Sequence, residues 1–130
     1  MKVTSLGIIM NGVTGRMGTN QHLARSVVAI RDQGGVRLKN GDLVIPDPVL
    51  VGRNEDKLRA LGKRFEITKF TTDLDLALSD SENKIYFDAQ VTDHRSPSVL
   101  KAIGAGKAVY CEKPVATSTK EALSLYAAAK

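Results

Sequence analysis

The sequence predicts an α/β fold built on a doubly wound, mostly parallel sheet. Short apolar segments alternate along the chain with amphipathic segments of helical period, which is the order of strands and helices in such a sheet. Three glycines, Gly12, Gly15 and Gly18, stand between the first apolar segment and the first amphipathic one. A glycine-rich turn that joins a strand to a helix is typical of this fold class.

The first strand is predicted over Val3–Met10, where the chain is apolar and β-prone. The first helix follows from about Arg16 to Gln33, because apolar residues recur three and four positions apart along this segment. Gly34-Gly35 is expected to end the helix, since glycine readily adopts the left-handed conformation that closes helices.

Residues 36–45 predict a β-hairpin. Asn40-Gly41 lies between two β-prone arms, and this dipeptide favours a two-residue type I′ turn. We expect the hairpin to be inserted between the first helix and the second core strand, Val49–Val51. Pro46-Asp47-Pro48 is expected to break the chain between the hairpin and that strand.

The remaining elements continue the alternation. Helices are expected to begin after caps at Asn54, Thr72 and Ser118, the last with Glu121 in the spacing of a capping box. A further helix is predicted from Ser96-Pro97, because proline is favourable in a first turn, and it ends at Gly106. The strands expected between these helices are Ile67–Phe70, Ile85–Ala89 and Ala108–Cys111.

The glycine-rich turn predicts a site for the pyrophosphate of a dinucleotide. Glycines let the chain turn sharply and bring backbone N–H groups close to an anion, and the following helix points its positive end at the same place. The strand, turn and helix appear here in the required order. The residues expected to hold the pyrophosphate are Gly12, Thr14, Gly15, Arg16, Met17 and Gly18.

The last predicted helix still continues at Lys130, where a six-stranded dinucleotide fold has one more strand. We therefore interpret residues 1–130 as a dinucleotide-binding domain of a longer protein whose second domain is absent from this chain. A natural five-stranded domain of this length is the alternative.

Composition narrows the class of protein. The chain has 130 residues and a net charge of +5, but its lysines and arginines are scattered and aromatic residues are few, so we expect no nucleic-acid partner. No apolar run approaches the roughly 20 residues that span a membrane. The single cysteine, Cys111, excludes an intrachain disulfide and favours a reducing compartment, so we expect a cytoplasmic location.

The end of the second core strand bears on the choice of cofactor. NAD sites usually carry Asp or Glu there to accept a hydrogen bond from the ribose 2′-hydroxyl. Gly52 stands at this point, and Arg53 follows with a planar fork suited to a 2′-phosphate. We therefore expect NADP rather than NAD, with Arg53 and Asn54 at the adenosine end. Stacking of Arg53 on the adenine is the alternative, and it leaves the choice open.

Glu112-Lys113-Pro114 directly follows the strand predicted at Ala108–Cys111. In an open parallel sheet, ligands bind at the carboxyl ends of the strands. A lysine in this place can donate to a substrate hydroxyl or carbonyl oxygen, so Lys113 is the predicted catalytic residue. Glu112 is expected to position that lysine and to lie beside the cofactor.

The glycine turn, Gly106-Lys107 and Glu112-Lys113-Pro114 together resemble the N-terminal half of the glucose–fructose oxidoreductase / inositol dehydrogenase / rhizopine catabolism (Gfo/Idh/MocA) family. The resemblance implies a Rossmann domain that precedes an α+β substrate domain. It also implies hydride transfer between a nicotinamide cofactor and a sugar- or polyol-like compound. Lys113 would contact the reacting hydroxyl and the nicotinamide ribose, before a cis peptide to Pro114.

The same resemblance places the other acid/base residues and the usual oligomer contacts in the second domain. This chain alone is therefore expected to be inactive. Dihydrodipicolinate reductase is the runner-up, because its glycine turn is similar to Gly15-Arg16-Met17-Gly18, although it lacks the Glu-Lys-Pro segment. A binding module that holds NADP(H) without hydride transfer is the alternative from another class.

Thr92-Asp93-His94-Arg95 follows the fourth core strand, in the segment that lines the nicotinamide side in the family. Thr92 is expected to donate to the cofactor, and His94 to face solvent or form a passive wall. His22 is interpreted as structural and Cys111 as a buried thiol. No His, Cys or carboxylate cluster has the spacing of metal ligands, so we predict no metal.

Overall fold

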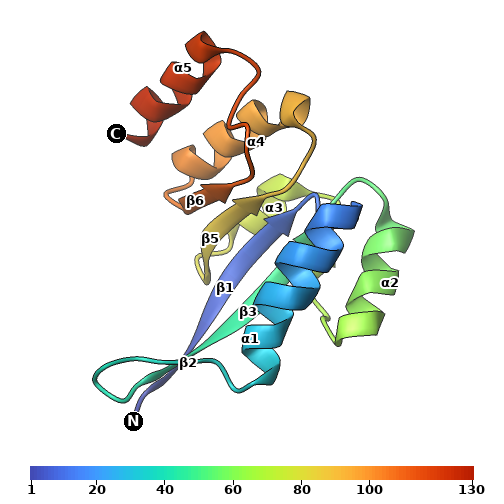
Figure 1. Cartoon of the computed structure of the whole chain (residues 1–130), viewed down its shortest axis with the longest axis vertical. Coiled ribbons are helices and arrows are strands. Elements are labelled where there is room, and N and C mark those ends of the chain that lie inside the picture. Colours follow the sequence, from blue (N-terminus) through green and yellow to red (C-terminus); the bar gives the residue numbers. More distant parts are fainter.

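The computed structural model describes all 130 residues, which form one six-stranded sheet with helices on both faces (Figure 1). Along the sheet the order is β2-β3-β1-β5-β6, and β4 also pairs with β3. Every pair is parallel except β2 with β3. The strands are β1 (Val3–Asn11), β2 (Val36–Arg37), β3 (Leu43–Val51), β4 (Phe70–Thr71), β5 (Asn83–Asp88) and β6 (Ala108–Cys111).

The helices confirm the doubly wound arrangement. They are η1 (Gly18–Val28), which follows the wider π geometry, α1 (Ala29–Asp32), α2 (Glu55–Phe65), α3 (Leu74–Ser79), α4 (Thr92–Gly104) and α5 (Thr119–Ala129). The first two form one continuous helix, which carries the label α1 in Figure 1. None of the helices is long and apolar enough to cross a bilayer.

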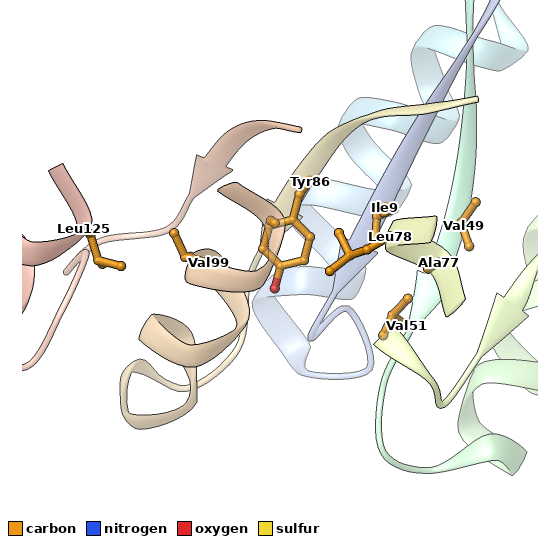
Figure 2. Close-up of a cluster of buried hydrophobic side chains, with 9 residues drawn as sticks. Ile9, Val49, Val51, Ala77, Leu78, Tyr86, Val99 and Leu125 are labelled. Carbon is orange, nitrogen blue, oxygen red and sulfur yellow. The ribbon is translucent and has the colours of Figure 1, made fainter. Parts of the chain in front are cut away.

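One face of the sheet packs against α3, α4 and α5. Alternate strand residues such as Ile9, Val49 and Tyr86 point to this face, because side chains alternate along a strand. Figure 2 shows the Tyr86 ring between Val99 of α4 and Leu78 of α3. These side chains form one continuous apolar layer that holds the carboxyl ends of β1, β3 and β5 in register.

The opposite face packs against η1 and α2. The neighbouring residues in each strand, Met10, Leu50 and Phe87, contact Leu23 of η1 and Leu58 of α2 in a second apolar cluster. Since the central strands are buried on both faces, they read as continuous apolar runs in the sequence. This explains why the positions of β1 and β5 were predictable.

The expected chain break at Pro46-Asp47-Pro48 is wrong, because β3 runs unbroken from Leu43 to Val51. The N–H of Leu43 points to β1, where it donates to Lys2 O, and the N–H of Leu50 points to β4, where it donates to Lys69 O. Even-numbered residues of β3 therefore direct their N–H away from β1. Pro46 and Pro48 are even-numbered, so the backbone N that lacks a hydrogen faces away from β1, toward the edge of β3 that pairs with β2 and β4. On that edge β2 pairs only with residues 43–44 and β4 only with residues 50–51. The two prolines lie between these pairings, so their missing N–H groups remove no hydrogen bond from the sheet.

The hairpin of residues 36–45 is confirmed, but its second arm is the start of β3 and its turn is not type I′. Type I′ requires positive φ at both central residues, whereas in this turn only Gly41 has positive φ, at 90°. The N–H of Gly41 donates to Leu38 O, and the N–H of Asp42 donates to the side chain of Asn40. The connection is therefore a three-residue loop, Lys39-Asn40-Gly41, shaped by the Asn40 side chain.

Three further boundaries differ from the predictions. Helix α3 is capped by Asp73, whose carboxylate accepts from the Leu76 N–H, rather than by Thr72. Strand β4 covers Phe70–Thr71 instead of Ile67–Phe70. Helix α4 begins at Thr92, four residues before the expected start at Ser96-Pro97, so Pro97 lies inside the helix. The caps at Asn54 and Ser118 are confirmed, with side chains accepting from Lys57 N and Glu121 N.

Candidate functional site

The carboxyl ends of four strands meet along one edge of the sheet. Beyond β1, the N–H of Gly12 donates to Val51 O at 3.2 Å, and the N–H of Ala89 donates to Asn11 O at 2.8 Å. The N–H of Glu112 then donates to Asp88 O at 2.9 Å. These bonds join the ends of β3, β1, β5 and β6 in turn. The glycine turn after β1 and the Glu112-Lys113-Pro114 turn after β6 therefore lie on the same edge.

Each glycine of the turn has a different reason to lack a side chain. Gly12 has a φ of 83°, and a Cβ there would lie 2.5 Å from the backbone N of Gln90. A Cβ on Gly18 would lie 2.7 Å from Gly12 O, so only glycine lets the helix approach the turn this closely. Gly15 is different, because its Cβ would meet only Gly12 O, at 3.7 Å. Gly12 and Gly18 are thus required by packing, whereas the outer side of Gly15 is open.

A cleft of about 200 Å³ lies over this turn. Thr14 and Gly15 line the cleft, and their N–H groups donate to no other group in the protein. Gln90, in the loop after β5, and His94, in the first turn of α4, also line the cleft. Of the residues predicted to bind a cofactor, those that line this cleft are Gly12, Thr14, Gly15 and Arg53.

The other predicted cofactor residues lie around the cleft without lining it. Gly18 is buried beneath the turn, whereas Arg16 and Met17 are exposed at the start of the helix. Asn54 is exposed and uses its side-chain oxygen to cap α2. Thr92 lies in the first turn of α4 rather than on a loop.

A second, larger cleft of about 420 Å³ continues along the same edge toward α3 and α4. It shares Asn11, Gly52, Arg53 and Gln90 with the first cleft, so Arg53 stands between the two. No carboxylate occupies the end of β3, as the sequence indicated. Asp73 and Asp75 line the far part of this larger cleft, where Asp75 pairs with Lys101 at 3.1 Å.

Lys113 lies one residue beyond the strand-end ladder, on an exposed turn closed by a cis peptide to Pro114. Its ammonium donates to no group in the protein, and its N–H donates to the Glu112 carboxylate at 3.2 Å. The same carboxylate bonds His22 Nε2 on η1. Glu112 therefore connects the turn to the first helix, and His22, expected to be structural, is its partner.

The sequence reasoning missed a buried polar cluster at the end of β5. The Asp88 carboxylate accepts from the Tyr86 hydroxyl at 2.5 Å and from Gln90 Nε2 at 2.8 Å. It also pairs with Arg95 Nε at 3.2 Å, and the side chains of Asp88 and Arg95 are 0% and 2% exposed. Arginine is almost never fully buried unless it is paired, so nothing in the sequence indicated that Arg95, in a predicted loop, is buried. The one available signal for this cluster was a single Asp at the end of an apolar strand.

Burial affects the ionisation of two groups here. Burial and the neighbouring Asp88 carboxylate raise the pKa of Tyr86 well above its ordinary value, so this hydroxyl keeps its proton and donates to Asp88. Burial also raises the pKa of the Cys111 thiol. Cys111 is partly rather than fully buried, and its raised pKa fits a thiol without a nucleophilic role.

The turn fits the pyrophosphate of a dinucleotide. The open side of Gly15 leaves space where a side chain would stand, and the N–H groups of Thr14 and Gly15 have no partners in the protein. Backbone N–H groups and a helix start at a glycine-rich turn form a concave site for anions. From this turn the clefts continue past Arg53 toward α3 and α4, and residues 112–114 lie on the same sheet edge.

Residues 7–130 match the model of the Gfo/Idh/MocA family, described as an oxidoreductase family with an NAD-binding Rossmann fold. The D-xylose dehydrogenase of Paenarthrobacter nicotinovorans is 44% identical over 124 residues, which are 95% of this chain and 32% of that enzyme. An oxidoreductase domain protein from Kribbella flavida is 27% identical, with a TM-score of 0.78, over 96% of this chain and 31% of that protein. GenD2 from gentamicin A biosynthesis, solved with NAD, is 29% identical, with a TM-score of 0.74, over 99% of this chain and 32% of GenD2.

The chain thus spans about a third of the length of the relatives it resembles. The match over residues 7–130 confirms the resemblance that the Glu-Lys-Pro segment indicated and does not favour dihydrodipicolinate reductase. This chain belongs to the Gfo/Idh/MocA oxidoreductase family and forms its NAD-binding Rossmann domain.

Proposed function

We propose that this chain is the cofactor domain of a dehydrogenase that moves hydride between NAD(P) and a hydroxyl or carbonyl carbon of a sugar- or polyol-like substrate. The observation that carries the proposal is the meeting of the open glycine turn and the Lys113 turn on one sheet edge. Ligands of open α/β sheets bind at this edge. The bound nicotinamide ring supplies the hydride chemistry.

The residues of the chain take distinct roles in this proposal. The N–H groups of Thr14 and Gly15 bind the pyrophosphate, and the helix that begins at Arg16 contributes its positive end. Gly12, Met17 and Gly18 shape the turn, and Thr92 and Glu112 lie on the nicotinamide side. Lys113, whose ammonium has no protein partner, donates to the reacting substrate oxygen.

The substrate class rests on the relatives. A D-xylose dehydrogenase shares 44% of its residues with this chain over the matched region, which supports a sugar-like substrate. The chain covers only 32% of that enzyme, so in this proposal the remaining acid/base groups and the substrate pocket lie in a second domain, and the 130-residue chain alone is inactive. Oligomer contacts are assigned to that domain too. The single free cysteine supports a cytoplasmic location.

We further propose a preference for NADP over NAD. The support is Gly52 at the end of β3, where an acidic residue would repel a 2′-phosphate, and Arg53 between the two clefts. Arg53 is exposed and forms no ion pair, so its guanidinium is available to a phosphate. Asn54 caps α2 beside it.

Calorimetric titration of the folded chain with NADPH and NADH tests both parts. We expect both to bind, NADPH more tightly, with the NADPH preference lost in Arg53→Ala. Arg59→Ala is the matched control, because Arg59 is an exposed arginine on α2 that lines neither cleft. Equal binding of the two cofactors would overturn the NADP preference alone, whereas a folded chain that binds neither would overturn the proposed function.

A further inference from the structure

Arg95 lies under the turn that carries Lys113. Its guanidinium donates from Nη1 to Glu112 O at 2.6 Å and to Pro114 O, the carbonyls on either side of Lys113. From Nη2 it donates to Gln90 O at 2.7 Å. One side chain on α4 therefore joins the loop after β5 to the turn after β6.

We propose that Arg95 is the positioning residue for Lys113, and that Asp88 holds Arg95 in place for this task. The proposal rests on the function proposed above for Lys113. Lys113 itself is exposed and its ammonium has no partner, so the backbone on either side of it determines where the ammonium stands. Arg95 binds that backbone on both sides.

Asp88 fixes the orientation of the guanidinium. It accepts from Arg95 Nε, from the Tyr86 hydroxyl and from both the N–H and the side chain of Gln90. These hydrogen bonds fix the Asp88 carboxylate in one orientation. Because Arg95 Nε donates to the same carboxylate, the planar guanidinium is fixed as well. Lysine cannot replace arginine here, because a single ammonium cannot reach three carbonyls and a carboxylate in one plane.

The same contacts connect Lys113 to the cofactor cleft. Gln90 lines both clefts and faces Gly12, where its backbone N lies 2.5 Å from the position a Cβ would take. Its carbonyl is one of the groups that Arg95 binds. The wall of the cleft and the Lys113 turn thus share one anchor, which keeps the lysine at a constant distance from a cofactor bound on the glycine turn.

The variant Arg95→Lys tests the proposal, because it keeps a positive charge beside Asp88 but loses the fork. Arg31→Lys is the matched control, since Arg31 also donates to a backbone carbonyl, Phe65 O at 2.6 Å, on a different part of the fold. The first readout is amide hydrogen exchange. We expect Arg95→Lys to speed exchange in residues 112–117 while β1 keeps its protection, and Arg31→Lys to leave residues 112–117 unchanged.

The second readout compares the affinities of NADH and ADP, which lacks both the nicotinamide and its ribose. We expect Arg95→Lys to weaken NADH about tenfold more than ADP, since only NADH carries the groups that reach Lys113. Equal losses for the two ligands, or unchanged exchange in residues 112–117, would overturn the positioning role.

Two other results, unfolding of the Arg95→Lys variant and a wild-type chain that binds no NADH, can be distinguished from failure of the proposal. If Arg95→Lys exposes the whole fold to exchange, Asp88→Asn becomes the test variant, because it keeps Arg95 and alters only the group that orients it. Faster exchange confined to residues 112–117 in Asp88→Asn supports the proposal, and exchange that rises equally in β1 overturns it. If the wild-type chain binds no NADH, the proposed function fails, and the exchange experiment alone then decides the role of Arg95.

Discussion

Gly15→Ala separates the binding role of the glycine turn from its role in folding. The Cβ of an alanine at this position would meet only Gly12 O, at 3.7 Å, which is an ordinary van der Waals contact. Gly15 does not have a positive φ, so alanine fits its backbone without strain. We expect the new methyl group to occupy space in the cleft, since Thr14 and Gly15 both line it and their N–H groups have no partner in the protein.

The expected magnitudes follow from this geometry. The free energy of unfolding should stay the same or rise by about 0.4–1 kcal/mol, because alanine restricts the unfolded chain. Binding of NADH should weaken about tenfold or more, since a displaced pyrophosphate loses at least one hydrogen bond to a charged group. The same variant is therefore expected to lose affinity while its stability is kept or raised.

Denaturant unfolding and calorimetric titration with NADH measure the two quantities. Gly104→Ala is the control, because Gly104 ends α4, has no atom within 4 Å of a new Cβ and lines neither cleft. It should match Gly15→Ala in stability and wild type in affinity. A stable Gly15→Ala chain that binds NADH like wild type would refute the assignment of the pyrophosphate to this turn.

Three further outcomes are expected. Gly18→Ala should lower the free energy of unfolding by about 1–3 kcal/mol in denaturant titration, because its Cβ would lie 2.7 Å from Gly12 O; an unchanged midpoint would contradict this. Asn54→Ala should cost about 1 kcal/mol through loss of the α2 cap, and Asn54→Asp, which keeps the cap, should cost less. The pKa of Tyr86 is higher in the folded protein than its value of 10.0 in the unfolded chain. The protonated hydroxyl therefore contributes its full stabilisation below pH 10.0, and the free energy of unfolding falls by about 1.4 kcal/mol for each pH unit above that value. Unfolding measured between pH 9 and about 11 should therefore show a shallower alkaline decline in Tyr86→Phe, and equal slopes would contradict the shift.

The parts of the fold that were predictable depend on local signals. The strand, turn and helix around Gly12 follow from glycine spacing and apolar periodicity, and the cap at Asn54 from residue type. The continuity of β3 through Pro46 and Pro48 was not predictable, because it depends on which neighbouring strand each N–H faces. That information exists only once the strand order is known.

The residues of the candidate site also differ in whether the sequence could identify them. Lys113 and the glycine turn were identified because each follows a strand in the sequence. Asp88 and Arg95 were missed because their meaning comes from burial and from carbonyls far along the chain, such as that of Pro114. The early start of α4 at Thr92 brings Arg95 under that turn, whereas the sequence suggested a loop there.

The most direct test of the central claim is an NMR titration of the ¹⁵N-labelled chain with NADH. The account predicts that the amide signals of Thr14 and Gly15 shift most, because their N–H groups receive the pyrophosphate, and that the Lys113 amide shifts with them. The amides of Gly41 and Gly104 should stay in place, since neither glycine lines a cleft along the strand-end edge. Large shifts elsewhere with Thr14 and Gly15 unmoved, or no shifts in a folded chain, would contradict the claim that this turn binds a dinucleotide.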